Sequence, residues 1–124
     1  MRRTKLLGVK MKIPLKIETH DRSLGFEMAG IGNKLSPGTI VDIPGGAKLQ
    51  YESTYIRKEV GIPEILGFIV EASITIDLSL LAAWLYQKVQ DKEVEKIVIR
   101  NTEITEINEG SIRKVLEQEI TIEK

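Results

Sequence analysis

Residues 61–90 read GIPEILGFIVEASITIDLSLLAAWLYQKVQ, and they carry two conflicting signals. From Val70 to Leu80 every second residue is apolar, which is typical of a strand with one buried face. From Leu80 to Val89 the residues are mostly good helix formers. The stretch therefore contains signals for both kinds of secondary structure.

A helix-start signal near the beginning favours the helical interpretation. Pro63 followed by Glu64 suits the first turn of a helix, because proline there lacks only an N–H that would be unbonded anyway. We therefore expect one long apolar helix over about 63–90. The alternative is a strand over 69–78 that leads into a helix from residue 79.

The same stretch does not predict a membrane span. A span needs about 20 predominantly apolar residues, and Glu64, Glu71 and Asp77 interrupt this one. The longest charge-free part, Leu78 to Gln87, is about half a span. We expect a buried helix, inside the domain or at a subunit contact.

The rest of the chain predicts short strands and turns. Alternation predicts a strand over 11–18, and glycine with polar residues predicts a loop over 21–37. Two strand-like runs, 39–43 and 48–57, flank a Pro-Gly-Gly turn, which is a hairpin signal because glycine reaches positive φ without steric cost. After the long helix we expect a β-hairpin over 95–100 and 102–107, a short helix after Asn108, and a terminal strand over 120–122.

The predicted fold is therefore α+β in a single domain. It has a β-rich N-terminal half, one long apolar helix, a β-hairpin, a short helix and a terminal strand. A length of 124 residues suits one core. We assign the domain to residues 11–124 and a basic N-terminal extension to residues 1–10.

Composition excludes several classes of site. The 18 Lys and Arg balance 18 Asp and Glu, which argues against specific nucleic-acid binding through a basic face. Without Cys there is no disulfide, no thiolate nucleophile and no Cys-ligated metal. With a single His and scattered Asp residues, we predict no metal and no cofactor. The first ten residues hold too short an apolar run for a signal peptide, and we expect a cytoplasmic protein.

The balanced charge hides an asymmetry along the chain. The stretch after residue 92 is rich in Glu, whereas the residues before Glu18 carry only basic charge. This pattern predicts head-to-tail complementarity within a subunit or between subunits. The basic residues are Arg2, Arg3, Lys5, Lys10, Lys12 and Lys16.

The only histidine lies in a sequence that contains the residue types of a catalytic triad. His20, Asp21 and Ser23 are nearly consecutive. A triad forms in space, and neighbouring loop residues rarely align as one. We therefore predict that the chain is not an enzyme.

One strand carries the most ligand-like side chains. On a regular strand, Tyr51, Tyr55 and Arg57 share one face and offer two aromatic platforms and a guanidinium for a nucleotide or another anion. Gly30 and Gly32 lie in a glycine-rich loop that could add an anion-binding nest. Cross-strand packing explains the two tyrosines equally well.

An apolar cluster near residue 84 predicts either core packing or a protein interface. It consists of Leu81, Trp84, Leu85 and Tyr86, and Trp and Tyr are common in interface hot spots. The leading prediction is a non-enzymatic protein-interaction or oligomerisation module with a homo-oligomer or another protein as partner. The alternative is a small-ligand binding protein.

The C-terminal half also resembles a known family. A helix ending in Leu81-Ala82-Ala83-Trp84-Leu85, followed by a hairpin and an amphipathic helix, is similar to the effector-associated constant component domains of bacterial conflict systems. The likeness covers residues 61–124. The basic helix end common in that family is replaced by Tyr86-Gln87-Lys88. The resemblance implies a non-catalytic adaptor that joins effector and sensor proteins, and it transfers no functional residue.

Overall fold

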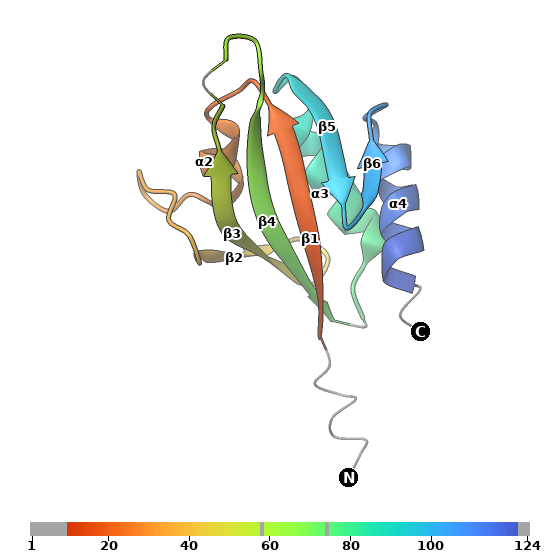
Figure 1. Cartoon of the computed structure of the whole chain (residues 1–124). Coiled ribbons are helices and arrows are strands. Elements are labelled where there is room, and N and C mark those ends of the chain that lie inside the picture. The colour runs from red at the N-terminus through yellow and green to blue at the C-terminus, as the bar shows by residue number, and fades with distance from the viewer. Residues whose placement is uncertain (1–9, 58, 74, 122–124) are drawn as a thin grey trace.

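The computed structural model describes residues 10–57, 59–73 and 75–121. These residues form six strands and three helices (Figure 1). In chain order the elements are β1 (Lys10–Thr19), α2 (Leu24–Ala29), β2 (Ile40–Ile43), β3 (Ala47–Tyr55), β4 (Glu64–Ser73), α3 (Leu78–Val89), β5 (Val94–Ile99), β6 (Thr102–Ile104) and α4 (Glu109–Thr121).

All six strands belong to one antiparallel sheet. Their order is β2-β3-β4-β1-β5-β6, so β4 and β1 form its centre. β2 and β6, the two edge strands, are the shortest, with four and three residues. Because β2 is shorter than its neighbour β3, it can cover only part of that strand.

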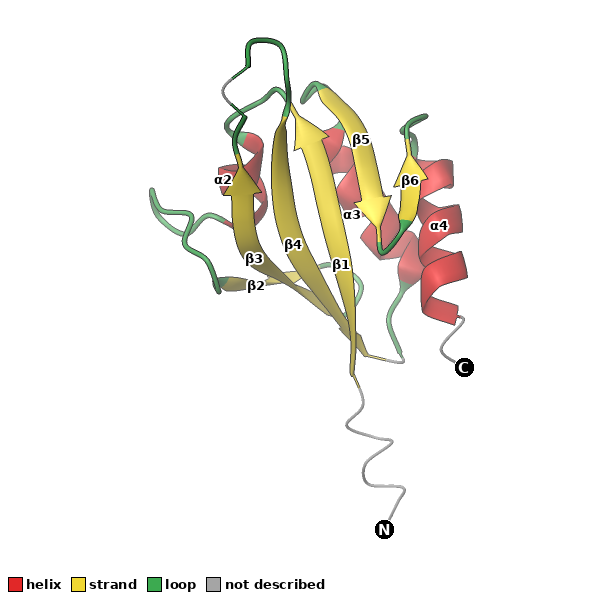
Figure 2. Ribbon diagram, viewed as in Figure 1, coloured by secondary structure: helices red, strands yellow, loops and turns green. Residues whose placement is uncertain are grey.

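The three helices lie on one face of the sheet (Figure 2). On β1, Ile13, Leu15 and Ile17 point to this helical face and are at most 2% exposed. Lys12 and Lys16 alternate with them and are exposed on the opposite face. One face therefore holds the core, and we call the other the open face.

The expectation of one long apolar helix over 63–90 is wrong. Residues Glu64–Ser73 are the strand β4, which pairs with β1 on one side and with β3 on the other. Leu66, Phe68 and Val70 point into the core, as the alternation of apolar and polar residues requires. Pairing on both sides of a central strand outweighs the local helix-start signal of Pro63.

The helix of this stretch is short and begins at Leu78. Asp77 provides its N-cap, because its side chain accepts a hydrogen bond from the Leu80 N–H at 3.1 Å. The alternative of a strand followed by a helix is nearer to the structure. Its strand begins five residues earlier than residue 69, at Glu64, and its helix begins at Leu78.

The expectation of a terminal strand over 120–122 is also wrong for residues 120 and 121, because α4 continues to Thr121, and residue 122 lies outside the described residues. Ile112, Leu116 and Ile120 recur every four residues and are at most 5% exposed, so helical spacing buries them. The hairpin before this helix is present as β5 and β6. At the other end, Lys10 already belongs to β1, and residues 1–9 of the expected basic extension lie outside the described residues.

The predicted hairpin around the Pro-Gly-Gly turn is confirmed as β2 and β3. Gly45 and Gly46 have φ of 95° and 80°, a region that favours glycine. The turn also contacts the start of α3, since the Asp77 N–H donates to the Gly45 carbonyl at 2.9 Å. The hairpin is thereby fixed to the helical layer.

Candidate functional site

The outer edge of β3 is only half covered. β2 pairs with β3 from Ala47 to Gln50. The segment before β2 adds one more position, because the Tyr51 N–H donates to Thr39 and the Gly38 N–H donates to the Tyr51 carbonyl. Beyond Tyr51, no described residue pairs with this side of the strand.

A β-bulge lies where the covered half of β3 ends. Tyr51 pairs with Phe68 and Ser53 with Gly67, so Glu52 is an extra residue in β3. A Cβ built on Gly67 would lie 3.4 Å from Ser53 Oγ and 4.0 Å from Glu52 Cβ. Since Gly67 alternates with buried neighbours, Glu52 and Ser53 both lie on the open face.

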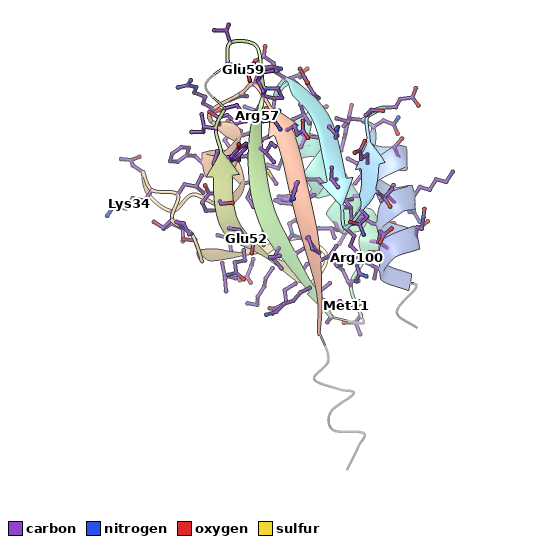
Figure 3. The ribbon with its side chains drawn as sticks, viewed as in Figure 1. Met11, Lys34, Glu52, Arg57, Glu59 and Arg100 are labelled. Carbon is purple, nitrogen blue, oxygen red and sulfur yellow. The ribbon has the colours of Figure 1, made fainter. Side chains whose placement is uncertain are left out.

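The uncovered end of β3 and the residues that follow it carry exposed apolar side chains. Tyr55 is 62% exposed, Ile56 is 61% exposed, and Val60 in the following loop is fully exposed. The Thr54 hydroxyl meets the hydroxyl of the buried Tyr51, so Thr54 points to the helical face and the next residue, Tyr55, points to the open face. The Arg57 guanidinium lies on the same face, 5.8 Å from the centre of the Tyr55 ring. Figure 3 labels Glu52 and Arg57 toward opposite ends of this segment. We call residues 52–57, which comprise the end of β3 and the two residues after it, the free β3 edge.

The end of this edge borders a hollow of about 350 Å³. Ile56, Arg57 and Val60 line one side of it, and His20, Arg22 and Glu64 line another. Arg22 lies 3.6 Å from the Glu64 carboxylate. The hollow therefore has both apolar and charged walls.

A polar network lies beside the hollow, at the end of β1. Lys92 Nζ donates to the Glu27 carboxylate at 2.7 Å and lies 4.0 Å from Asp21. The Ser23 hydroxyl lies 2.6 Å from Asp21 Oδ1 and 3.0 Å from Glu27 Oε2. These contacts join α2 to the turn after α3.

The network keeps its members charged. Hydrogen bonds from Ser23 lower the pKa of Asp21, and the Lys92 hydrogen bond lowers the pKa of Glu27. The same bond to Glu27 raises the pKa of Lys92. A general base works best with a pKa near neutrality and a nucleophilic lysine with a depressed one. Here the pKa values of Asp21 and Glu27 are lowered and that of Lys92 is raised, as in a structural ion-pair network.

His20 takes no part in a triad. Its Nε2 pairs with the Glu95 carboxylate, whereas the Ser23 hydroxyl pairs with Asp21 and Glu27. The described part of the chain holds no group of three or more His, Cys, Asp or Glu side chains that could bind a metal.

The structure separates the residues predicted to bind a ligand. Tyr51 is 5% exposed on the helical face, packs edge-on against Phe68 and hydrogen-bonds to the Thr54 hydroxyl. Tyr55 and Arg57 are on the open face. The expectation that all three share a face is wrong, because the bulge at Glu52 reverses the alternation.

The two glycines predicted for an anion-binding nest lie in different local structures. The Gly30 N–H donates to the Phe26 carbonyl at 2.9 Å at the end of α2. Gly32, with φ of 64°, lies in a tight turn closed by hydrogen bonds between Ile31 and Lys34. The glycines thus serve a helix end and a turn.

The residues predicted for an interface divide into two pairs. Leu81 and Leu85 are 2% exposed and belong to the core of the domain. Trp84 and Tyr86 are partly buried against that core. This cluster therefore packs α3 onto the sheet.

Sequence reasoning missed Glu52 and Ile56. The adjacent apolar residues Tyr55 and Ile56 interrupt period-two alternation near the end of a strand, and this was the available signal. It could not show which strand edge would remain uncovered.

Comparisons of the chain with protein-family models, curated proteins and solved structures gave no match. The resemblance to effector-associated constant component domains thus stays a prediction. Within the described residues, no helix is long and apolar enough to cross a membrane.

Proposed function

We propose that the chain is a non-catalytic protein-interaction module whose docking surface is the free β3 edge. The observation that supports this proposal is an uncovered strand edge flanked by the exposed side chains of Tyr55, Ile56 and Val60. Such an edge presents unpaired N–H and C=O groups to an extended polypeptide, and the apolar side chains add contact area.

The composition of the edge supports this use. Natural edge strands are commonly protected by lysine, proline or inward-pointing charges. The residues 53–56 are Ser, Thr, Tyr and Ile, which carry no charge and favour strand structure, although the bulge at Glu52 and the charge of Arg57 lie at the ends of this stretch. Lys48 lies in the half of β3 that β2 already covers.

Small-ligand binding has weaker support. It requires Tyr51, Tyr55 and Arg57 to contact the ligand together, and Tyr51 lies on the opposite face of the sheet from the other two. An adaptor role in bacterial defence or signalling, which the resemblance implies, is compatible with a strand-docking edge.

The test is selection of extended peptides from a displayed random library on dilute protein. Wild type is compared with a Tyr55→Lys/Ile56→Lys variant, which puts a lysine on each face of the edge. Leu80→Lys is the matched control, because Leu80 is also an exposed apolar residue, on α3.

The proposal expects peptides that bind wild type and the control but not the edge variant. Bound peptides should also slow amide hydrogen exchange in residues 53–57. Peptides that bind all three proteins equally, or no selected peptide at all on a protein that stays monomeric, would refute it.

A further inference from the structure

The free β3 edge is bounded by features that limit what can pair with it. On its N-terminal side, the outer N–H and C=O of Tyr51 are already bonded to Thr39 and Gly38. A docking strand therefore cannot form backbone hydrogen bonds with Tyr51. The stretch open to pairing begins at the bulge and is centred on Tyr55.

This stretch carries opposite charges at its two ends. Glu52 and Arg57 are both exposed, and neither has an ion-pair partner among the described residues. Both side chains lie on the open face. An antiparallel strand with the same sequence would bring opposite charges together at each end.

We infer that a second copy of this chain pairs with the free β3 edge, β3 against β3, around a twofold axis at Tyr55; this rests on the proposed docking function of that edge. Such an axis is perpendicular to the sheet, so it places residues of the same face opposite each other. β3 ends at Tyr55, so this pairing also requires Ile56 and Arg57 to extend the strand when the second copy binds. Tyr55 then faces its own copy, Thr54 faces Ile56 and Ser53 faces Arg57.

The charges fit this register. Glu52 and Ser53 both occupy the open face at the bulge. Arg57 of one copy is opposite Ser53 of the other, so it lies diagonally beside Glu52 of that copy, within reach of a long side chain. The twofold axis makes this ion pair twice, and two six-stranded sheets join into one.

A neighbouring register is excluded by the covered half of β3. With the axis at Thr54, Arg57 would face Tyr51 of the other copy. The outer side of Tyr51 is already occupied by Gly38 and Thr39. With the axis at Tyr55, pairing stays within residues 53–57.

Charge exchange tests the inference. Light scattering and sedimentation over about a hundredfold range of concentration should show a reversible dimer in wild type. Glu52→Arg and Arg57→Glu should each raise the dimer dissociation constant about tenfold or more, because each puts like charges together. The double variant Glu52→Arg/Arg57→Glu should restore dimerisation. Both positions are exposed, and circular dichroism verifies that each variant is folded.

Cross-linking tests the register, and the absence of Cys makes it simple. Tyr55→Cys should form an intermolecular disulfide on mild oxidation, because directly opposite residues lie at a spacing that a disulfide can bridge. Thr54→Cys should cross-link much less, since it would face Ile56. Gln87→Cys, on the exposed side of α3, is the control.

The outcomes separate this inference from the proposed function. A wild-type protein that is monomeric at every concentration but binds extended peptides at the same edge would overturn self-pairing and leave the docking function standing. A dimer indifferent to both charge reversals, with no disulfide at position 55, would also overturn it. A monomer that binds no peptide through this edge would overturn both.

Discussion

Tyr51 and Tyr55 are four residues apart on β3, and their side chains lie on opposite faces of the sheet. Tyr51 packs edge-on against Phe68 with 5.9 Å between ring centres, and it is 5% exposed. Tyr55 is 62% exposed beside Arg57. The extra residue Glu52 causes the reversal, because it shifts the pairing of β3 with β4 by one position.

Alanine substitution should distinguish the two tyrosines by their stability effects. Tyr51→Ala should lower the free energy of unfolding by about 3–5 kcal/mol, because it removes a buried aromatic ring. Tyr55→Ala should change it by no more than about 0.5 kcal/mol. Urea unfolding of dilute protein measures both. Losses of similar size would contradict the assignment of the two rings to opposite faces.

The neighbouring leucines of α3 allow a second matched comparison. Leu81 is 2% exposed and Leu80 is 53% exposed. Leu81→Ala should therefore cost about 2–5 kcal/mol of unfolding free energy, whereas Leu80→Ala should cost about 0.5 kcal/mol or less. Thermal and urea unfolding measure the difference. A small effect at Leu81 would return it to the set of interface candidates.

The two glycines of the β2–β3 turn should tolerate alanine differently. A Cβ on Gly45 would lie 2.7 Å from the Asp77 carbonyl oxygen, whereas one on Gly46 would meet nothing within 4 Å. Gly46→Ala therefore suffers only the cost of positive φ, about 1–2 kcal/mol. Gly45→Ala should lose at least about 1 kcal/mol more, because the turn must also move away from α3. Equal losses in urea unfolding would show that this contact is not tight.

The ion pair of Lys92 and Glu27 predicts a pH-dependent stability. The lowered pKa of Glu27 stabilises the fold above its ordinary value of 4.5, and this contribution is lost as the pH falls through the folded value. The raised pKa of Lys92 contributes fully below its ordinary value of 10.5 and is lost as the pH rises through the folded value. Both contributions are therefore present between these limits.

Lys92→Met should remove this stabilisation. Its urea midpoint should lie below that of wild type between pH 4.5 and 10.5, and the two should converge on either side. Lys34→Met is the control, because Lys34 is exposed and has no ion pair within the described residues. If the urea midpoint of Lys92→Met stays below that of wild type by the same amount in acid, the loss comes from packing of the Lys92 side chain and not from its charge.

The sequence allowed some elements to be predicted because their signals are local. Two glycines at a turn predict the β2–β3 hairpin, and Ile112 with Leu116 predicts the helix α4. Residues 64–73 were harder, because their structure depends on pairing with β1 and β3, which come from other parts of the chain. A local helix-start signal at Pro63 cannot show that pairing.

The candidate site was predictable only in part, for a similar reason. Tyr55 and Arg57 are side chains whose types suggest binding, and the structure keeps them together at the surface. The sequence does not show that Glu52 is a bulge residue or that β2 covers β3 only as far as Gln50. An uncovered edge is a property of the whole sheet, and single residues do not encode it.

The decisive measurement is amide hydrogen exchange in residues 53–57 at increasing protein concentration. It shows whether the free β3 edge is open in the monomer and becomes covered by a second copy. We expect fast exchange of the outward amides in dilute protein and increasing protection at high concentration, while exchange in Ile40–Ile43 of β2 stays unchanged. Protection already present in the dilute monomer would contradict an open edge, and fast exchange at every concentration would contradict pairing between copies.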